Sequence, residues 1–136
     1  MKAYIDTSSV KVVLDTNALM VPEQFKVDIF SELLRLGYAK WLVPASVLGE
    51  LRSLAIRADK GRDKTAARVA LGLAERCNAI GEDDYDADQA IEGLALETGA
   101  AVFTNDRALK KRLFSKGITV VYLRQGRYLE ATKKEY

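Results

Sequence analysis

The sequence predicts an α/β domain, a three-layer α/β/α sandwich around a central, mostly parallel sheet of five strands. Short apolar runs rich in β-branched residues alternate with longer stretches whose apolar residues recur at helical spacing. Strands that alternate with helices form parallel sheets covered on both faces. Because 136 residues is a typical domain length, we expect a single domain over residues 1–136, with its core at 10–123 and a tail at 124–136.

The first half of the expected sheet comes from two apolar runs. Residues 10–14 have the sequence VKVVL, a β-branched run bounded by polar residues, which is typical of a buried strand. A helix is expected at 24–36, where apolar residues recur at helical spacing until Gly37 supplies a C-terminal stop. The second strand is expected at 40–43 and ends at Pro44.

Two helices and a weak strand occupy the middle of the chain. A helix is expected at about 46–58, and a loop at 59–63 separates it from a second helix at about 64–76, which is rich in alanine and leucine. Residues 77–80 form a weak third strand. The alternation of strand and helix therefore continues through this region.

The last third of the chain repeats the same alternation. A helix at about 87–98 precedes a strand at 101–104, and a helix at about 107–116 precedes a strand at 118–123. The final residues, 131–136, are expected to fray. Right-handed crossovers place the carboxyl ends of all the parallel strands at one edge of the sheet, and ligands bind outside that edge where the strand order reverses.

The composition excludes several classes of protein. Hydrophobic residues make up 49% and charged residues 29%, which fits a compact globule and excludes a disordered chain. No apolar run approaches the roughly 18 residues that a membrane span needs, and the first residues lack the apolar stretch of a secretory signal. A single cysteine, Cys77, excludes an internal disulfide, so we expect a cytoplasmic protein with no membrane partner.

The chain contains no histidine, and this narrows the chemistry that an active site could use. It excludes a Ser-His-Asp triad, a Cys-His pair and any nuclease that uses imidazole as acid or base. Together with the single cysteine it also excludes zinc sites of the Cys/His kind. Any catalysis must therefore use carboxylates, lysine, hydroxyl groups or a hard metal ion.

Charge is segregated along the chain although the net charge is only +2. Residues 82–97 contain seven acidic residues and no basic one, whereas residues 107–134 contain nine basic residues and one acidic one. An acidic stretch beside basic ones suits a metal site flanked by a surface that binds phosphates. Solvated helix faces would produce the same pattern.

Four carboxylates fall at the edge of the sheet where the strands end. Asp15 and Asp106 directly follow expected strands, and Glu50 and Asp88 lie in the first turns of helices that follow strands. Asp106 could equally serve as a helix N-cap. An acid that ends a central apolar strand, as Asp15 does, would be close to buried. In the crowded third acidic cluster Asp86 is the alternative to Asp88.

Converging carboxylates repel one another, and divalent cations relieve this repulsion. Oxygen-only ligands favour one or two Mg²⁺ or Mn²⁺ ions over zinc. A metal-activated water then needs no histidine. Because basic residues lie alongside, the substrate that suits this site is a phosphodiester.

Neighbouring residues have candidate supporting roles. Thr16 and Asn17 are placed to orient Asp15 through hydrogen bonds, and Thr104 and Asn105 flank Asp106 in the same way. A turn role explains Asn17 nearly as well. The three basic residues after Asp106 that are placed to hold substrate phosphates, or to form a solvated helix face, are Arg107, Lys110 and Lys111.

Two other classes of protein fit the residues less well than a metal-dependent site for phosphodiesters does. A receiver-type phosphoacceptor domain would need a second acid beside Asp15 and a lysine after the last strand, and neither is present. A phosphatase with an Asp-x-Asp nucleophile is excluded because Asn17 occupies the position of the second aspartate.

Four motifs together resemble the PIN-domain nucleases. They are VVLDTNALM with Asp15, VPASVLGELRSL with Glu50, DADQAIEGLALETGA with Asp88, and AVFTNDRALKKRL with Asp106, in the family's order and spacing. The resemblance implies a PIN-like fold and a metal-dependent endoribonuclease of single-stranded RNA, with these four acids as catalytic metal ligands.

The segments QFKVDIFSELLRLG and GITVVYLRQGRYLE look closest to the archaeal relatives of the ribosome-processing PIN branch. This resemblance implies a role in ribosomal RNA processing, with a ribosome-assembly partner. Two alternatives stay open, a toxin-type PIN ribonuclease with an antitoxin partner and a catalytically silent domain that binds RNA. Many PIN proteins pair as homodimers, which the resemblance extends to this chain.

Overall fold

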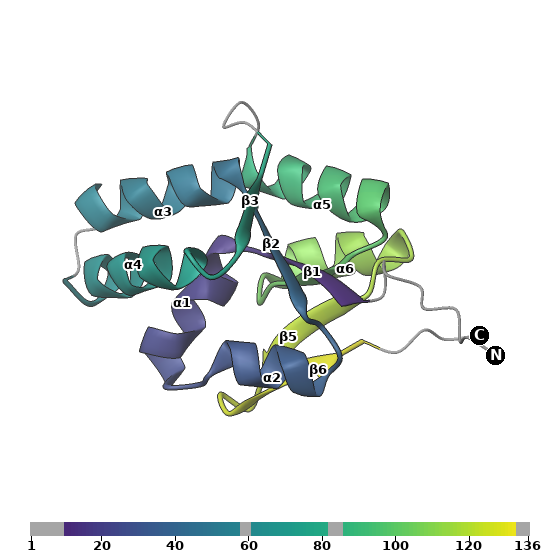
Figure 1. The fold of residues 1–136 in the computed structure, drawn as a ribbon, viewed down its shortest axis with the longest axis horizontal. Helices are drawn as coiled ribbons and strands as arrows, with labels where there is room; N and C mark the ends of the chain where they lie inside the picture. Colours follow the sequence, from purple (N-terminus) through teal and green to yellow (C-terminus); the bar gives the residue numbers. More distant parts are fainter. Residues whose placement is uncertain (1–9, 58–60, 82–85, 133–136) are drawn as a thin grey trace.

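The computed structural model describes residues 10–57, 61–81 and 86–132. Within these residues six strands form one sheet, and helices cover both of its faces (Figure 1). The strands are β1 (Lys11–Leu14), β2 (Lys40–Pro44), β3 (Asn78–Ile80), β4 (Ala101–Phe103), β5 (Val120–Arg124) and β6 (Tyr128–Ala131). The helices are α1 (Thr16–Phe25), α2 (Ile29–Arg35), α3 (Ala45–Arg57), α4 (Gly61–Ala74), α5 (Ala87–Thr98) and α6 (Arg107–Ser115). The predicted α/β sandwich is confirmed.

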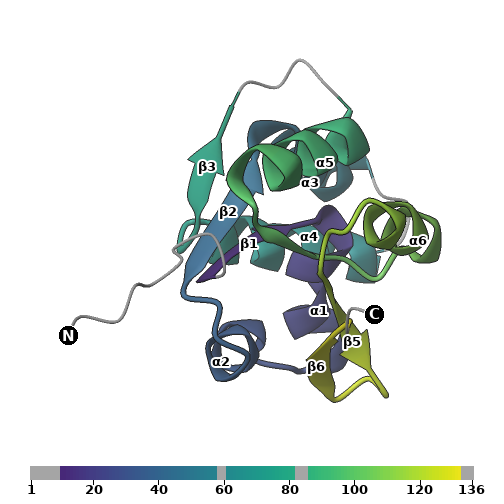
Figure 2. The same ribbon diagram turned by 90° about the vertical axis from the view of Figure 1, so that its right-hand side faces the viewer.

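The order of the strands reverses beside β1. The sheet runs β3-β2-β1-β4-β5-β6, so the chain moves outward from β1 through β2 to β3 and then crosses to β4 on the other side. All neighbouring strands are parallel except β5 and β6. Helices α5 and α6 lie on one side of the sheet and α2 lies on the other (Figure 2). The carboxyl ends of β1 and β4 therefore flank the reversal point, where α/β sheets bind their ligands.

The centre of the sheet is apolar on both faces. The side chains of Val12, Val13 and Leu14 in β1 have no exposed surface, and neither do those of Val102 and Phe103 in β4. A parallel strand with helices on both faces needs apolar side chains at consecutive positions, which explains the unbroken apolar runs. These runs are why the strands could be predicted from the sequence.

The prediction of five strands was wrong by one. We expected the sheet to end at 123, but β6 pairs antiparallel with β5 and adds an edge strand. The turn between them has positive φ at Gln125 and Gly126, and the N–H of Arg127 donates to the carbonyl of Arg124 at 3.1 Å. Glutamine is an unusual residue at a positive φ, so the sequence carried a weak turn signal.

The helix predicted at 24–36 was also wrong, because two helices meet in this segment. Helix α1 ends at Phe25, and Lys26 adopts a left-handed conformation with φ 58°. Asp28 then caps α2 by accepting a hydrogen bond from the backbone of Ser31 at 3.1 Å. The apolar spacing runs across this boundary, so periodicity alone joined the two helices and left most of α1 unpredicted.

The remaining differences are small. Helix α4 begins at Gly61, inside the loop expected at 59–63, while residues 58–60 lie outside the described residues. Most of the end expected to fray, residues 133–136, also lies outside them, but Ala131 belongs to β6. Within the described ranges no helix has both the length and the apolar composition that a membrane span requires.

Candidate active site

Two chain segments meet at the reversal point of the sheet. Leu14, the last residue of β1, pairs in register with Phe103, the last residue of β4. Asp15 and Thr104 follow these two residues directly, and the N–H of Asp15 donates to the carbonyl of Phe103 at 3.0 Å. The parallel register therefore places Asp15 beside the start of the loop that leads to Asp106.

Asp15 is buried and both of its carboxylate oxygens accept hydrogen bonds. The residue is only 6% exposed. Its Oδ1 accepts from the N–H of Thr16 at 2.8 Å. Its Oδ2 accepts from Thr104 Oγ1 at 2.6 Å and from Asn17 Nδ2 at 3.3 Å. The near-complete burial expected for an acid at the end of a central strand is confirmed.

The surroundings of Asp15 raise its pKa above the ordinary value. The largest cause is burial, which disfavours the charged form. Hydrogen bonds from Thr104 and from the backbone of Thr16 oppose this effect and lower the pKa. The negative charges of Asp88 and Glu50 raise it further, so both acids lie within electrostatic reach of Asp15.

Asp88 is a half-buried acid in the first turn of α5. Burial is the largest cause that raises its pKa, and the charges of Asp106 and Asp86 add to this, while Arg112 lowers it. Asp88 therefore lies within electrostatic reach of both Asp15 and Asp106.

Asp106 and Asp86 are helix N-caps, as Asp15 is for α1. Asp106 is exposed, and its Oδ1 accepts hydrogen bonds from the N–H groups of Ala108 at 2.9 Å and Leu109 at 3.1 Å. Asp86 caps α5 in the same way, because its Oδ1 accepts from the N–H of Gln89 at 3.1 Å. These bonds satisfy N–H groups that have no partner within a helix. The cap gives each residue a structural role, and the negative charges of both Asp86 and Asp106 also raise the pKa of Asp88.

Thr104 links two of the acids. Besides donating to Asp15, its hydroxyl oxygen accepts a hydrogen bond from the N–H of Asp106 at 3.1 Å. We expected Thr104 to support Asp106, and the structure shows that its shortest hydrogen bond is with Asp15. The two residues are 89 positions apart, and no local pattern in the sequence could have paired them.

Two asparagines join the strand ends around Asp15. Asn17 Oδ1 accepts from the N–H of Asn105 at 2.9 Å, while its amide group donates to Asp15. Asn105 Oδ1 in turn accepts from the N–H of Leu123 in β5 at 2.8 Å. The amide side chains therefore tie together the segments that follow β1, β4 and β5, and they hold the loop that carries Asp106 in place.

The donor set at this edge consists of oxygen atoms alone. Glu50 is an exposed residue of α3, and its carboxylate is close enough to Asp15 to raise the pKa of that residue. The hydroxyl oxygens of Thr16 and Ser46 are buried and have no hydrogen-bond partner among the described residues. Carboxylates with spare hydroxyls are the ligands that hard cations such as Mg²⁺ and Mn²⁺ take. Chemically, the residues present fit such an ion.

The acids influence one another electrostatically but do not form a tight cluster. Within the described residues, no group of three or more acidic or cysteine side chains lies close enough to hold a metal ion jointly. The charges of Glu50 and Asp88 raise the pKa of Asp15, and the charge of Asp106 raises the pKa of Asp88. Any ion bound here would be coordinated partly through water.

The three predicted RNA-binding residues lie on α6, which begins directly after Asp106. Arg107 and Lys111 are exposed and Lys110 is half-buried. Two aromatic residues near them were not anticipated from the sequence. Phe114 lies on the same helix, and the ring of Tyr122 lies beneath the Lys110 ammonium group, 3.4 Å from it.

Comparisons with known proteins identify the family of this chain. The family model described as a PIN-like domain matches residues 12–126. The chain is 35% identical to Ribonuclease VapC9 of Archaeoglobus fulgidus over 83% of this chain and 82% of that protein. It is 32% identical to Ribonuclease VapC4 of Methanocaldococcus jannaschii over 88% of this chain and 95% of that protein.

Solved structures share the fold. The PIN domain endonuclease Utp24 superposes with a TM-score of 0.74 and 25% identity, covering 91% of this chain and 92% of that one. A domain of a functionally unknown protein from Methanocaldococcus jannaschii superposes with a TM-score of 0.58 and 21% identity, over 93% of this chain and 95% of that one. The fold, the family match and the relatives identify a PIN-domain nuclease. The chain belongs to the PIN-like domain family, and the curated relatives it resembles are ribonucleases.

Proposed function

We propose that this protein is a metal-dependent endoribonuclease that cleaves phosphodiesters in single-stranded RNA. The observation that carries the proposal is Asp15, a buried carboxylate at the reversal point of the sheet, within reach of two further acidic charges. The names of the relatives, a ribonuclease in two cases and an endonuclease in a third, support the same activity. Mg²⁺ or Mn²⁺ is the cofactor that the oxygen-only donor set favours.

Each acid has a distinct part in the proposed site. Asp15 is the central ligand, held by Thr104 and the backbone of Thr16. The three acids that complete the ligand set, directly or through water, are Glu50, Asp88 and Asp106. When bound, the ion would lower the pKa of a water molecule and offset charge on the phosphate.

The protein's own residues set the conditions for this chemistry. The hydroxyl of Thr104 fixes the orientation of Asp15 and, through the N–H of Asp106, the start of the loop beside it. Asn17 and Asn105 hold that loop against β5. The chain offers no histidine as a general base, so proton removal near neutral pH depends on these carboxylates and the ion they hold.

The test is cleavage of a labelled single-stranded RNA and of its matched duplex by the purified protein. We expect cleavage of the single strand with Mg²⁺ or Mn²⁺, complete loss of cleavage in EDTA, and recovery when Mn²⁺ is added in excess. Cleavage that survives EDTA would contradict the metal. A protein that binds RNA but cleaves none with Mn²⁺ present would instead be a catalytically silent RNA-binding domain.

Thr104 offers a further prediction, because it acts on the metal only through Asp15. Replacing Thr104 by valine preserves shape but removes the donor that lowers the pKa of Asp15. We expect Mn²⁺ affinity at neutral pH to fall by about tenfold or more, and Thr104→Ser to restore it. Calorimetric titration with Mn²⁺ measures this directly.

Thr98→Val is the matched control for Thr104→Val. The Thr98 hydroxyl also donates a hydrogen bond, to the carbonyl of Leu94 at 2.6 Å, but it lies at the far end of α5 from Asp88. Its removal should leave Mn²⁺ affinity unchanged. Equal Mn²⁺ binding by Thr104→Val and wild type would show that Thr104 does not position Asp15 for the ion.

The physiological RNA is a separate question from the chemistry. Ribosomal RNA processing and a toxin role opposed by an antitoxin would both use the same four acids, so the site does not choose between them. The gene neighbourhood does, because an adjacent small antitoxin gene would favour the toxin role. A homodimer is compatible with either role, and light scattering of the purified protein tests it.

A further inference from the structure

The basic residues of α6 divide between two faces of the helix. Arg112 and Lys116 both pair with Glu92 of α5, at 2.8 Å and 2.9 Å. Glu92 therefore compensates part of their positive charge, and these ion pairs help to hold α6 and its C-cap residue Lys116 against α5. The other basic residues of this helix, Arg107, Lys110 and Lys111, form no ion pair with any described residue and face a different part of the surface.

These uncompensated residues line a hollow. It has a volume of about 420 Å³ and is formed by Arg107, Lys110, Lys111, Phe114 and Thr132. No acidic residue is among them. Hollows of a few hundred Å³ are the size that small organic ligands occupy. The hollow therefore combines three positive charges with an aromatic ring.

The aromatic ring is accessible and one of the cations is held in place. Phe114 is 42% exposed although it is a large apolar side chain. The Lys110 ammonium group lies over the ring of Tyr122, an interaction that favours one position of this flexible side chain. An exposed aromatic ring beside fixed positive charge is the arrangement with which proteins bind single-stranded nucleic acid, since the base stacks on the ring and the phosphates meet the cations.

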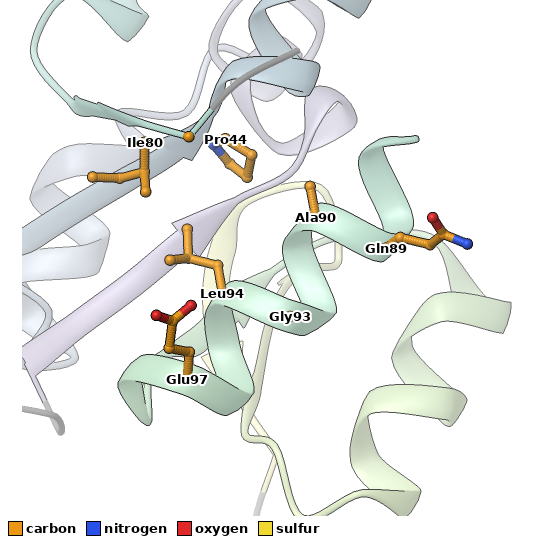
Figure 3. Close-up of a pocket in the computed structure, with 8 residues that line it drawn as sticks. Pro44, Ile80, Gln89, Ala90, Gly93, Leu94 and Glu97 are labelled. Carbon is orange, nitrogen blue, oxygen red and sulfur yellow. The ribbon is translucent and has the colours of Figure 1, made fainter. Parts of the chain in front are cut away.

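A second hollow of similar size lacks the positive charge found on α6. It has a volume of about 400 Å³ and lies between α5 and the end of β3 (Figure 3). Its lining includes Ile80 and Leu94, and among the described residues that line it only the acidic Glu97 is charged. A phosphate would be repelled there, so of these two hollows the one on α6 has the charge that complements RNA.

The hollow on α6 is also close to the acids. Arg107 directly follows Asp106, and Phe114 lies seven positions after Arg107, which corresponds to about 10 Å along a helix. An RNA strand with one phosphate at the acids would therefore place a neighbouring nucleotide beside this face of α6.

We propose that the hollow between α6 and the end of β6 is a nucleotide subsite, in which a base of single-stranded RNA stacks on Phe114 while its phosphates contact Arg107, Lys110 and Lys111. This inference rests on the proposed function for its ligand, but it concerns binding and needs no catalysis. Stacking tolerates every base, so the subsite contributes affinity and strand placement.

The experiment measures binding of fluorescein-labelled oligouridylate to the full-length protein by anisotropy in EDTA, over a range of salt concentrations. Phe114→Ala should weaken binding by about tenfold, with an unchanged slope of log affinity against log salt concentration, because stacking releases no counterions. Phe114→Trp should bind as well as wild type. Lys111→Ala should flatten the slope by up to about 0.7, because one phosphate of the strand is then no longer neutralised by a lysine.

Phe25→Ala is the matched control. Phe25 is also exposed, at 48%, but it lies at the end of α1, and its replacement should leave RNA affinity unchanged. An equal weakening for both phenylalanines, an unaffected Phe114→Ala, or a wild type that binds no oligonucleotide would each overturn the subsite. Normal binding with no cleavage in Mn²⁺ would contradict only the proposed nuclease activity, whereas normal cleavage with unaffected Phe114→Ala would contradict only the subsite.

Discussion

Replacement of Asp106 by asparagine is expected to lower the turnover of single-stranded RNA by about 100-fold or more, equivalent to about 2.7 kcal/mol, while RNA still binds. Asparagine and aspartate cap helices about equally well, so the hydrogen bonds to Ala108 and Leu109 are preserved. The substitution therefore removes the charge that a metal ion requires and leaves the fold unchanged. Single-turnover cleavage of labelled RNA measures the decrease, and anisotropy measures the retained binding.

Asp28→Asn is the matched control for this variant. Asp28 is likewise an exposed N-cap aspartate, of α2, and it accepts from the N–H of Ser31. We expect it to cleave RNA like wild type. If Asp106→Asn also cleaves at the wild-type rate, then Asp106 is a helix cap and nothing more, and the proposed ligand set has one member fewer.

Asparagine substitutions also distinguish Asp86 from Asp88 as the candidate metal ligand at the start of α5. Asp86 caps the helix through Gln89, whereas Asp88 makes no such cap and shares an electrostatic environment with Asp15 and Asp106. Asp88→Asn should therefore lose turnover and Asp86→Asn should retain it, in the same single-turnover assay. The reverse result would make Asp86 the ligand.

Much of this architecture could be predicted because it depends on local pattern and on general rules of topology. The unbroken apolar runs around Val12 and Val102 indicated buried parallel strands, and parallel strands share one carboxyl edge. That rule alone was enough to gather the acids that follow the strands. Neither step required knowledge of which strand lies beside which.

The features that escaped prediction depend on single backbone conformations or on contacts between distant residues. The break at Lys26 requires a left-handed residue within an apolar pattern that continues past it. The last strand depends on positive φ at Gln125, which the sequence does not signal. The bond between Thr104 and Asp15 exists only because β1 and β4 are neighbours, and an order of strands cannot be read from either motif.

Asp15→Asn is expected to make the metal-free protein more stable at neutral pH, and to abolish stabilisation by Mn²⁺. Burial raises the pKa of Asp15, so the ionised carboxylate opposes folding in the absence of a cation. Asparagine can still accept from the N–H of Thr16 and can donate to the Thr104 hydroxyl, so that only the hydrogen bond from Asn17 at 3.3 Å is removed. The melting temperature in EDTA should rise by a few degrees.

The dependence on pH follows from the direction of this pKa shift. A carboxyl group whose pKa is raised by folding binds more protons in the folded state than in the unfolded one. Its contribution to stability is complete below the unfolded pKa, near 3.8, and is lost as pH rises through the higher folded pKa. The advantage of Asp15→Asn should therefore grow with pH above about 4 in EDTA. Asp28→Asn should show the opposite trend, because hydrogen bonding from Ser31 lowers the pKa of Asp28.

Mn²⁺ should change the melting temperatures of wild type and Asp15→Asn differently. An ion at 100 times its dissociation constant stabilises the folded state by about 2.7 kcal/mol, which corresponds to roughly 10 °C in the melting temperature of a domain of this size. Wild type should gain this shift and Asp15→Asn should not, because the variant lacks the carboxylate proposed as the central ligand. Differential scanning calorimetry with Mn²⁺ and with EDTA gives both comparisons in one series. A variant that melts well below wild type in EDTA would mean that the hydrogen bonds of ionised Asp15 outweigh its burial, and an equal Mn²⁺ shift in both proteins would place the ion away from Asp15.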